Sequence, residues 1–139
     1  MTSQLMEYFN RQPRIGTISS AGKDGKVDVA VMGSPHMTDE KTVVLGSGAN
    51  RTLANLRENP HAVYMIMEPG QGIMDWKGVR VYMTLKDLAT SGPAFDGYKA
   101  QLAMVVGEDA ASMIKAVATF EVTEVRPIVD MGQGWERSI

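Results

Sequence analysis

The alternation of apolar and polar side chains over residues 78–85 constrains the fold of this chain more than any other feature. The apolar members are Val79, Val81, Met83 and Leu85, and the polar members are Arg80, Tyr82 and Thr84. Because successive side chains of a β-strand point to opposite faces of the sheet, the pattern predicts a strand with one buried face. Sheet structure therefore frames the interpretation of the rest of the sequence.

Two more strand-like runs, 15–20 and 27–32, are separated by a polar turn that contains Asp24-Gly25. Asp-Gly between two such runs is a strong hairpin signal, because glycine accepts the positive φ that the turn needs. Further apolar runs predict strands over residues 42–45, 62–67 and 118–123. The run 62–67 is almost continuously apolar, which favours cover on both of its faces.

Short helices are predicted to flank these strands. They are expected over residues 3–11, after the glycine loop that follows the strand at 42–45, from Ser91 to about Val105, and after Gly107. Ser3 is a suitable N-cap for the first helix, and Pro13 ends it. The segment between the second and third strands is expected to be loop, with His36 as an exposed loop residue and a polar turn over 38–41.

Six strands joined by hairpins predict an antiparallel sheet, which usually curls into a barrel and so removes its edges. The chain has no repeated βαβ alternation, which argues against a doubly wound sheet. At 139 residues we expect a single domain over 1–139 with its core at about 14–126. A C-terminal tail, 127–139, follows the core, and its Gly-rich part from Asp130 to Ile139 is expected to be partly mobile.

Composition excludes several classes of function. The chain has no cysteine, which removes thiolate metal sites, iron–sulfur clusters and a cysteine nucleophile, and which fits a reducing compartment. The net charge is −2 without a basic cluster, so nucleic acid is not expected as a partner.

No apolar run approaches the roughly 20 residues of a membrane span, and the start shows no secretory signal. We therefore expect a cytoplasmic protein without membrane contact. The two histidines make no recognisable metal motif, and no metal is expected.

The segment 43–60 carries the clearest chemistry and reads as strand, glycine loop and capped helix. Open backbone N–H groups and the positive end of the helix dipole meet at such a helix start, where they bind phosphate readily. Arg51 can grip two phosphate oxygens, and nearby hydroxyls can donate further hydrogen bonds. The predicted phosphate-binding residues are Gly46, Ser47, Gly48, Asn50, Arg51 and Thr52.

Taken alone, this loop leaves the phosphate site and a purely structural helix cap as open alternatives. It lacks the Gly-Lys-Ser/Thr of a Walker A loop. It also lacks the third glycine and the βαβ unit of a dinucleotide-binding fold.

The order hairpin, strand, Gly-Ser-Gly-Ala-Asn-Arg-Thr, Leu-Ala-Asn-Leu-Arg-Glu-Asn-Pro and apolar strand resembles the flavin-binding split-barrel family related to pyridoxamine 5′-phosphate oxidase. The short bacterial FMN-binding proteins are the most similar part of that family. The resemblance covers about Arg14 to Arg126 and includes Ser91-Gly-Pro-Ala-Phe95. It implies a mainly β, six-stranded Greek-key split barrel with short flanking helices.

The same resemblance implies flavin mononucleotide (FMN) as cofactor, with its phosphate held at Ser47, Arg51 and Thr52. It implies further that the edge of the isoalloxazine ring meets the backbone of the second strand. The positions that match are Ala30, Val31 and Met32. The family is dimeric with flavin between the subunits, so a homodimer is expected, and Trp135 lies in a tail that a partner subunit could order.

The implied activity is that of an FMN-dependent oxidoreductase or electron carrier with a small-molecule redox partner or substrate. No side chain stands out as a catalytic acid or base. A non-enzymatic flavin-binding or regulatory module and a reductase that uses the deazaflavin F420 remain open alternatives. Pyridoxamine phosphate oxidation is not expected, because the only cations after Gly107 are Lys115, Arg126 and Arg137 and no histidine follows it.

Overall fold

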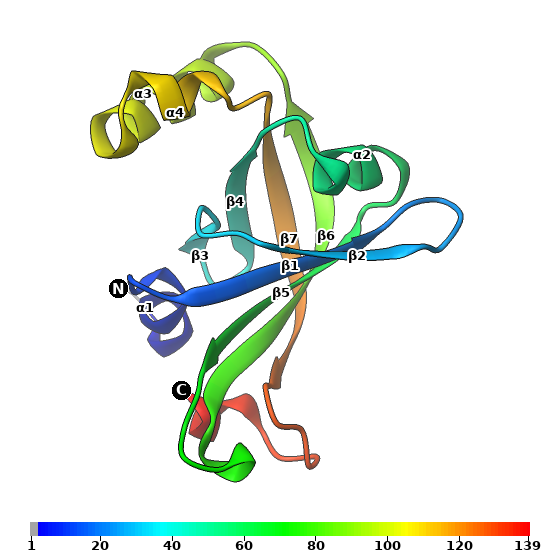
Figure 1. Ribbon diagram of the computed structural model, residues 1–139, viewed down its shortest axis with the longest axis vertical. Helices are drawn as coiled ribbons and strands as arrows, with labels where there is room; N and C mark the ends of the chain where they lie inside the picture. Colours follow the sequence, from blue (N-terminus) through cyan, green and yellow to red (C-terminus); the bar gives the residue numbers. More distant parts are fainter. Residues whose placement is uncertain (1–2) are drawn as a thin grey trace.

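The computed structural model describes residues 3–139 and consists of one antiparallel sheet with short helices around it (Figure 1). Residues 1 and 2, which the predicted single domain includes, lie outside the described range. The strands are β1 (Ile15–Ala21), β2 (Val27–Val31), β3 (His36–Asp39), β4 (Thr42–Ser47), β5 (His61–Glu68), β6 (Lys77–Ala89) and β7 (Ala116–Pro127). The helices are α1 (Gln4–Asn10), α2 (Arg51–Glu58), α3 (Pro93–Val106) and α4 (Glu108–Ser112), with single 3-10 turns η1 (Ile73–Asp75) and η2 (Trp135–Ser138).

All six predicted strands are present, but the structure has a seventh, β3, where the sequence predicted a loop. His36 therefore lies in a strand, where it pairs with Val44 of β4. The strand is only four residues long, and Met37 is its one buried side chain. So short an element shows too little alternation to be detected, and its hydrogen bonds with β4 hold it in place.

The prediction that barrel closure removes the sheet edges is wrong. The strand order is β2-β1-β5-β6-β7-β4-β3, so β2 and β3 end the ladder and each has a neighbour on one side only. The sheet coils instead, and Figure 1 shows β1 and β2 crossing in front of β6 and β7. Two open strand edges therefore remain on the single chain.

The core lies on the inner face of this coiled sheet, as the alternation in 78–85 predicts. Val79, Val81 and Met83 of β6 are at most 1% exposed. Leu85 is partly buried at the margin of the core, and the pairing of β6 with β7 shifts register just after it. The alternation therefore places the buried face correctly through Met83, beyond a first register shift between Tyr82 and Met83.

Arg14 ties α1 to the connection between β2 and β3. Its guanidinium carbon lies 5.2 Å from the ring centroids of both Phe9 and Tyr64, within cation–π range. The same group donates hydrogen bonds to the carbonyl oxygens of Phe9, Gly33 and Pro35. One side chain thus holds the start of β1, the end of α1 and the approach to β3 together.

The outer face of the sheet is apolar over β2 and β5, with hydroxyl side chains of β1 between them. Val27, Val29 and Val31 of β2 are 85%, 63% and 84% exposed. Cross-strand pairing places Ser19 between Val29 and Val63, and Thr17 between Val31 and Met65. The segment 62–67 is thus buried on its inner face and half-buried on its outer face in a single chain.

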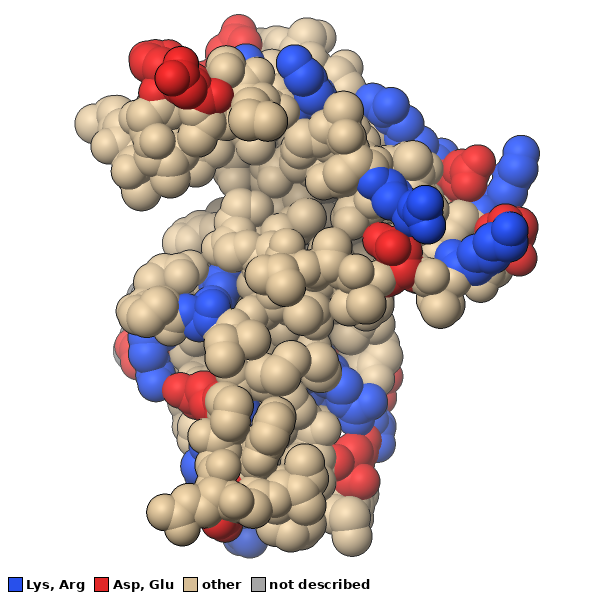
Figure 2. Space-filling view, in the orientation of Figure 1, with Lys and Arg blue, Asp and Glu red and all other residues tan. Residues whose placement is uncertain are grey.

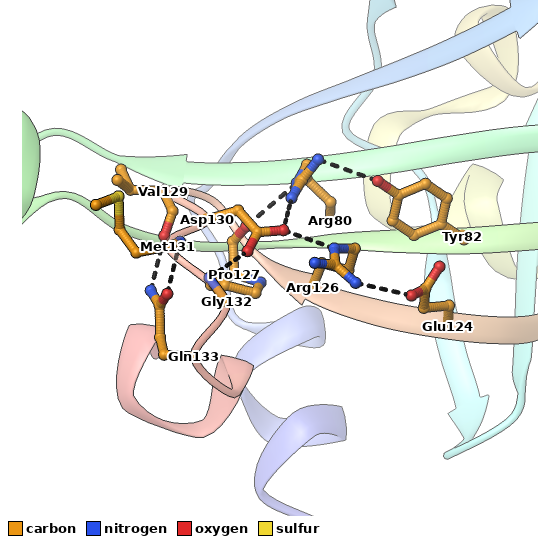
Figure 3. Close-up of polar contacts among 10 residues, drawn as sticks. All are labelled: Arg80, Tyr82, Glu124, Arg126, Pro127, Val129, Asp130, Met131, Gly132 and Gln133. Carbon is orange, nitrogen blue, oxygen red and sulfur yellow. Dashed lines mark hydrogen bonds and ion pairs between the residues drawn. The ribbon is translucent and has the colours of Figure 1, made fainter.

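The C-terminal tail is tied to the sheet rather than extended into solvent. Asp130 bridges two strands, because its carboxylate accepts hydrogen bonds from Arg80 of β6 at 2.7 Å and from Arg126 of β7 at 2.6 Å (Figure 3). Gly132 N–H also donates to Asp130 at 3.0 Å. Beyond this turn, Trp135 packs against the core of its own chain. Within residues 3–139, no helix is long and apolar enough to cross a membrane.

We expect the tail network to make stability depend on acid pH. The hydrogen bond from Arg126, with that from Gly132, lowers the pKa of Asp130 from 3.8 to about 2. A lowered carboxyl pKa stabilises the folded state above the unfolded-state value, and this contribution is lost as the pH falls through about 2. The difference in thermal midpoint between wild type and Asp130→Asn should be largest above pH 5 and shrink toward pH 2. Glu40→Gln, at an exposed turn, is the control, and a pH-independent difference for Asp130→Asn would contradict the expectation.

Candidate anion-binding site

The start of α2 has the cap that the sequence predicts. Asn50 is in extended conformation, and its Oδ1 accepts a hydrogen bond from the N–H of Leu53 at 2.9 Å. The first N–H groups of a helix have no intrahelical acceptor. Among residues 3–139, nothing accepts a hydrogen bond from the N–H of Arg51 or Thr52. Two donors at the positive end of the helix are therefore open to a ligand.

The side chains around these donors differ in access. Arg51 is exposed and has no ion pair or hydrogen bond to any part of the chain that the structure describes. Ser47 and Thr52 are only 2% and 1% exposed. The Oγ of Ser47 lies 3.1 Å from the carbonyl oxygen of Gly48 and 3.3 Å from Oδ1 of Asn50. Arg51 is thus the side chain able to move to an anion, while Ser47 helps to fix the loop beneath it.

Gly46 lies where the pairing of β3 with β4 has already ended. Its N–H donates to Oη of Tyr98 at 2.9 Å, and its carbonyl oxygen accepts from Oγ of Ser34 at 3.2 Å. A Cβ at this position would lie 2.5 Å from Cε1 of Tyr98. The missing side chain of Gly46 therefore makes room for the ring of Tyr98.

The second predicted contact surface is the edge strand β2. The N–H of Met32 donates to the carbonyl oxygen of Gly16 on β1, and its own carbonyl accepts from Oη of Tyr64 at 2.5 Å. In an antiparallel ladder the residues that point their polar groups toward the neighbouring strand alternate. Ala30 therefore faces β1 as Met32 does, and Val31 directs its N–H and C=O to the open edge. Of the three predicted positions, Val31 has the backbone groups available to a ligand.

The structure brings the end of β2 and the end of β4 together. Ser34 follows β2 closely and reaches Gly46, and Nδ2 of Asn55 on α2 donates to Oγ of Ser20 on β1 at 3.1 Å. Figure 2 shows a hollow between the lobe formed by α3 and α4 and the segment that carries β3. In the same orientation, Figure 1 shows β4 in that gap. Since α2 also packs against β1 and β2, the helix that carries the open donors lies beside the strand that carries the open edge.

No acid–base pair is assembled in this region. Burial raises the pKa of Tyr98, and the hydrogen bond from Gly46 opposes that shift. Tyr98 is therefore a neutral phenol at physiological pH. His61 is exposed at the start of β5, with its Nδ1 3.5 Å from Oγ1 of Thr84. Over the residues described, no group of three His, Cys, Asp or Glu side chains could hold a metal ion.

Two residues of the site were not predicted from sequence, Ser34 and Tyr98. Ser34 lies in the Gly33-Ser34-Pro35 turn, where it looks like an ordinary turn residue. Tyr98 is 52 positions away from Gly46, and nothing in the pattern of α3 indicates that it reaches β4. The glycine is the only local signal, because a conformationally ordinary glycine in a strand suggests a close approach by another group.

The chain belongs to the pyridoxamine 5′-phosphate oxidase family, whose family model matches residues 2–128. Several solved structures share the fold. An FMN-binding protein from Syntrophomonas wolfei subsp. wolfei is 24% identical with a TM-score of 0.75, over 89% of this chain and 83% of that one. The heme storage protein HutZ from Vibrio cholerae is 14% identical with a TM-score of 0.66, over 96% and 100% of the two chains.

A third structure, described as an F420 reductase, is 14% identical with a TM-score of 0.63, over 89% of this chain and 98% of that one. At these identities the similarity establishes the fold and not the ligand. No curated protein matches the sequence at a significant level.

Proposed function

We propose that this protein binds FMN and acts as an oxidoreductase or electron carrier. The observation that carries the proposal is the pair of open N–H groups at Arg51 and Thr52, beside an unpaired arginine, in a chain of this family. A phosphate monoester fits such a helix start, because it accepts several hydrogen bonds and favours the positive end of the dipole. The same fold in an FMN-binding protein supports the choice of ligand.

The chain's own residues would divide the work of binding. Arg51 and the first turn of α2 would hold the phosphate, with Ser47, Gly48 and Asn50 fixing the loop. The open N–H and C=O of Val31 would meet the polar edge of the ring. When bound, flavin supplies the redox chemistry, and the protein contributes position and electrostatics. This division fits a site without an acid–base pair of side chains.

Other cofactors on this fold define the alternatives. A deazaflavin cofactor is the alternative that the F420 reductase suggests, and a non-enzymatic flavin-binding module remains a second alternative. Heme is less suited, because neither 30–32 nor 46–52 contains a histidine, cysteine or tyrosine, and Met32 is the one side chain there of a type that serves as an axial ligand. The visible spectrum of the purified protein before and after dithionite, with chromatography of the released cofactor, distinguishes these outcomes. A colourless protein that takes up no FMN would refute the proposal.

We further propose that the protein works as a homodimer through the outer face of β2, β1 and β5. A row of exposed valines beside an unpaired strand edge is typical of an interaction surface, because both features are unfavourable in water. A second copy supplies a matching apolar surface, since a two-fold interface uses the same patch on both subunits. It would also cover the outer side of β5, where Val63 and Met65 are half-buried.

The phosphate contact is tested by Arg51→Ala. Loss of a charge-assisted hydrogen bond should weaken FMN binding by about 2–3 kcal/mol, with little change in the stability of the apo protein. Fluorescence titration of apo protein with FMN measures the change. Arg57→Ala, an exposed arginine in the last turn of the same helix, should leave the affinity unchanged. Equal affinities for wild type and Arg51→Ala would refute the phosphate assignment.

The homodimer is tested by sedimentation equilibrium at micromolar concentration. The holo protein should have twice the chain mass of 15.1 kDa. Val29→Asp places a charge in the proposed interface and should give a monomer, because an unpaired carboxylate is costly to bury. Ile73→Asp changes an equally exposed side chain in η1 and should leave the dimer intact. A wild-type monomer that retains flavin would contradict the interface.

We expect no pyridoxal phosphate formation from pyridoxamine phosphate under aerobic turnover. That reaction needs a second phosphate site of convergent cations beside the flavin. Arg126 is engaged by Asp130 and by Glu124 at 3.0 Å, and Arg137 lies in η2. The flavin-loaded protein should still accept electrons from dithionite, which is the positive control. Turnover of about 1 s⁻¹ or more would overturn this expectation.

A further inference from the structure

The lobe formed by α3 and α4 has little buried surface, and it meets the rest of the chain at β7 and at the end of β4. Phe95 is the only buried residue of α3, while Met104 and Val105 near its end are more than four-fifths exposed. A helix pair with so little packed surface gains its position from a few specific contacts. Those contacts therefore show what the lobe is placed against.

Besides the packing of α3 on β7, contacts from the lobe and from the segment that joins it to β7 fall on three successive residues of the predicted phosphate loop. Tyr98 of α3 accepts the hydrogen bond from Gly46, and its ring lies against the glycine backbone. Lys115, which joins α4 to β7, donates its N–H to the carbonyl oxygen of Ser47 at 2.8 Å, at the end of the pairing of β4 with β7. A Cβ on Gly48 would lie 3.3 Å from the carbonyl oxygen of Met113. The lobe thus supports the loop from one side, and α2 continues from its other end.

Tyr98 supplies a hydrogen-bond partner that a neighbouring strand would otherwise provide at this point. The pairing of β3 with β4 ends at His36 and Val44, so the N–H and C=O of Gly46 have no neighbouring strand to bond. Buried backbone groups without partners are unfavourable, and here Tyr98 and Ser34 satisfy one each. Their hydrogen bonds fix the peptide that leads into Ser47, whose hydroxyl group contacts the helix cap Asn50.

We propose that Tyr98 is a positioning residue for the phosphate loop, and that the α3–α4 lobe serves to place it there. The inference rests on the proposed binding of FMN phosphate at this loop. Tyr98 acts through Gly46 and does not contact the cofactor. Its hydroxyl group holds β4 in the orientation that keeps the donors of α2 convergent before the ligand arrives. Such pre-organisation increases affinity because less ordering remains to be done on binding.

The test compares FMN with riboflavin, which is the same flavin without the phosphate. Tyr98→Phe removes the acceptor for Gly46 N–H and keeps the ring. It should lower FMN affinity about tenfold, the change that corresponds to one lost hydrogen bond, and leave riboflavin affinity unchanged. Tyr8→Phe is the matched control, because it removes a hydroxyl group bonded to Glu68, away from the loop, and should leave both affinities unchanged. Titrations of both flavins and the ³¹P chemical shift of bound FMN are the readouts.

The outcomes separate the two levels of the argument. A fall in the ratio of FMN to riboflavin affinity, with a shifted phosphorus resonance, supports the positioning role. An unchanged ratio, or an equal loss for both flavins, overturns that role while leaving FMN binding by wild type intact. If wild type binds neither flavin, the proposed function and this inference are both wrong. Should Tyr98→Phe fail to fold, Ser34→Ala removes the other support of Gly46 and carries the same expectation.

Discussion

The early end of one strand ladder shapes the candidate site. The pairing of β3 with β4 ends at His36 and Val44. Beyond Val44, β4 continues for three residues with only β7 beside it. The polar backbone groups that this exposes must find other partners, because the region is buried. Side chains from two distant segments provide them at Gly46. The glycine loop therefore begins from a backbone that is already fixed, and α2 starts in a defined direction.

The open edge of β2 presents the opposite situation. Its polar groups on the outer side have no strand to bond, and its valines project into solvent. Proteins usually protect such an edge with charges, proline or a bulge. Here Asp28 points to the other face, opposite Ser20, so no charge interrupts the apolar row. An unprotected edge next to the phosphate loop is readily explained if another molecule covers it.

The parts of the fold that could be predicted from sequence depend on local signals. The turn at Asp24-Gly25 follows from a glycine with φ of +81°, and the cap at Asn50 follows from its position before a helix with one buried face. By contrast, β3 exists because β4 pairs with it, and the two open edges follow from which strands meet across the sheet. No local pattern encodes either feature. The same holds for Tyr98, because its role depends on a contact across 52 positions.

The two halves of the candidate site are thus prepared to different degrees. The proposed phosphate half is built within one chain, by the cap, the loop and the α3–α4 lobe. The proposed ring half is an exposed strand edge with no neighbouring strand on its outer side. If a second copy completes it, cofactor binding and dimer formation become linked equilibria, and each must strengthen the other by the same factor. A monomer that binds only the phosphate would then hold flavin weakly until it dimerises. The reason is that its phosphate site is formed within one chain, whereas the surface for the ring needs the second copy.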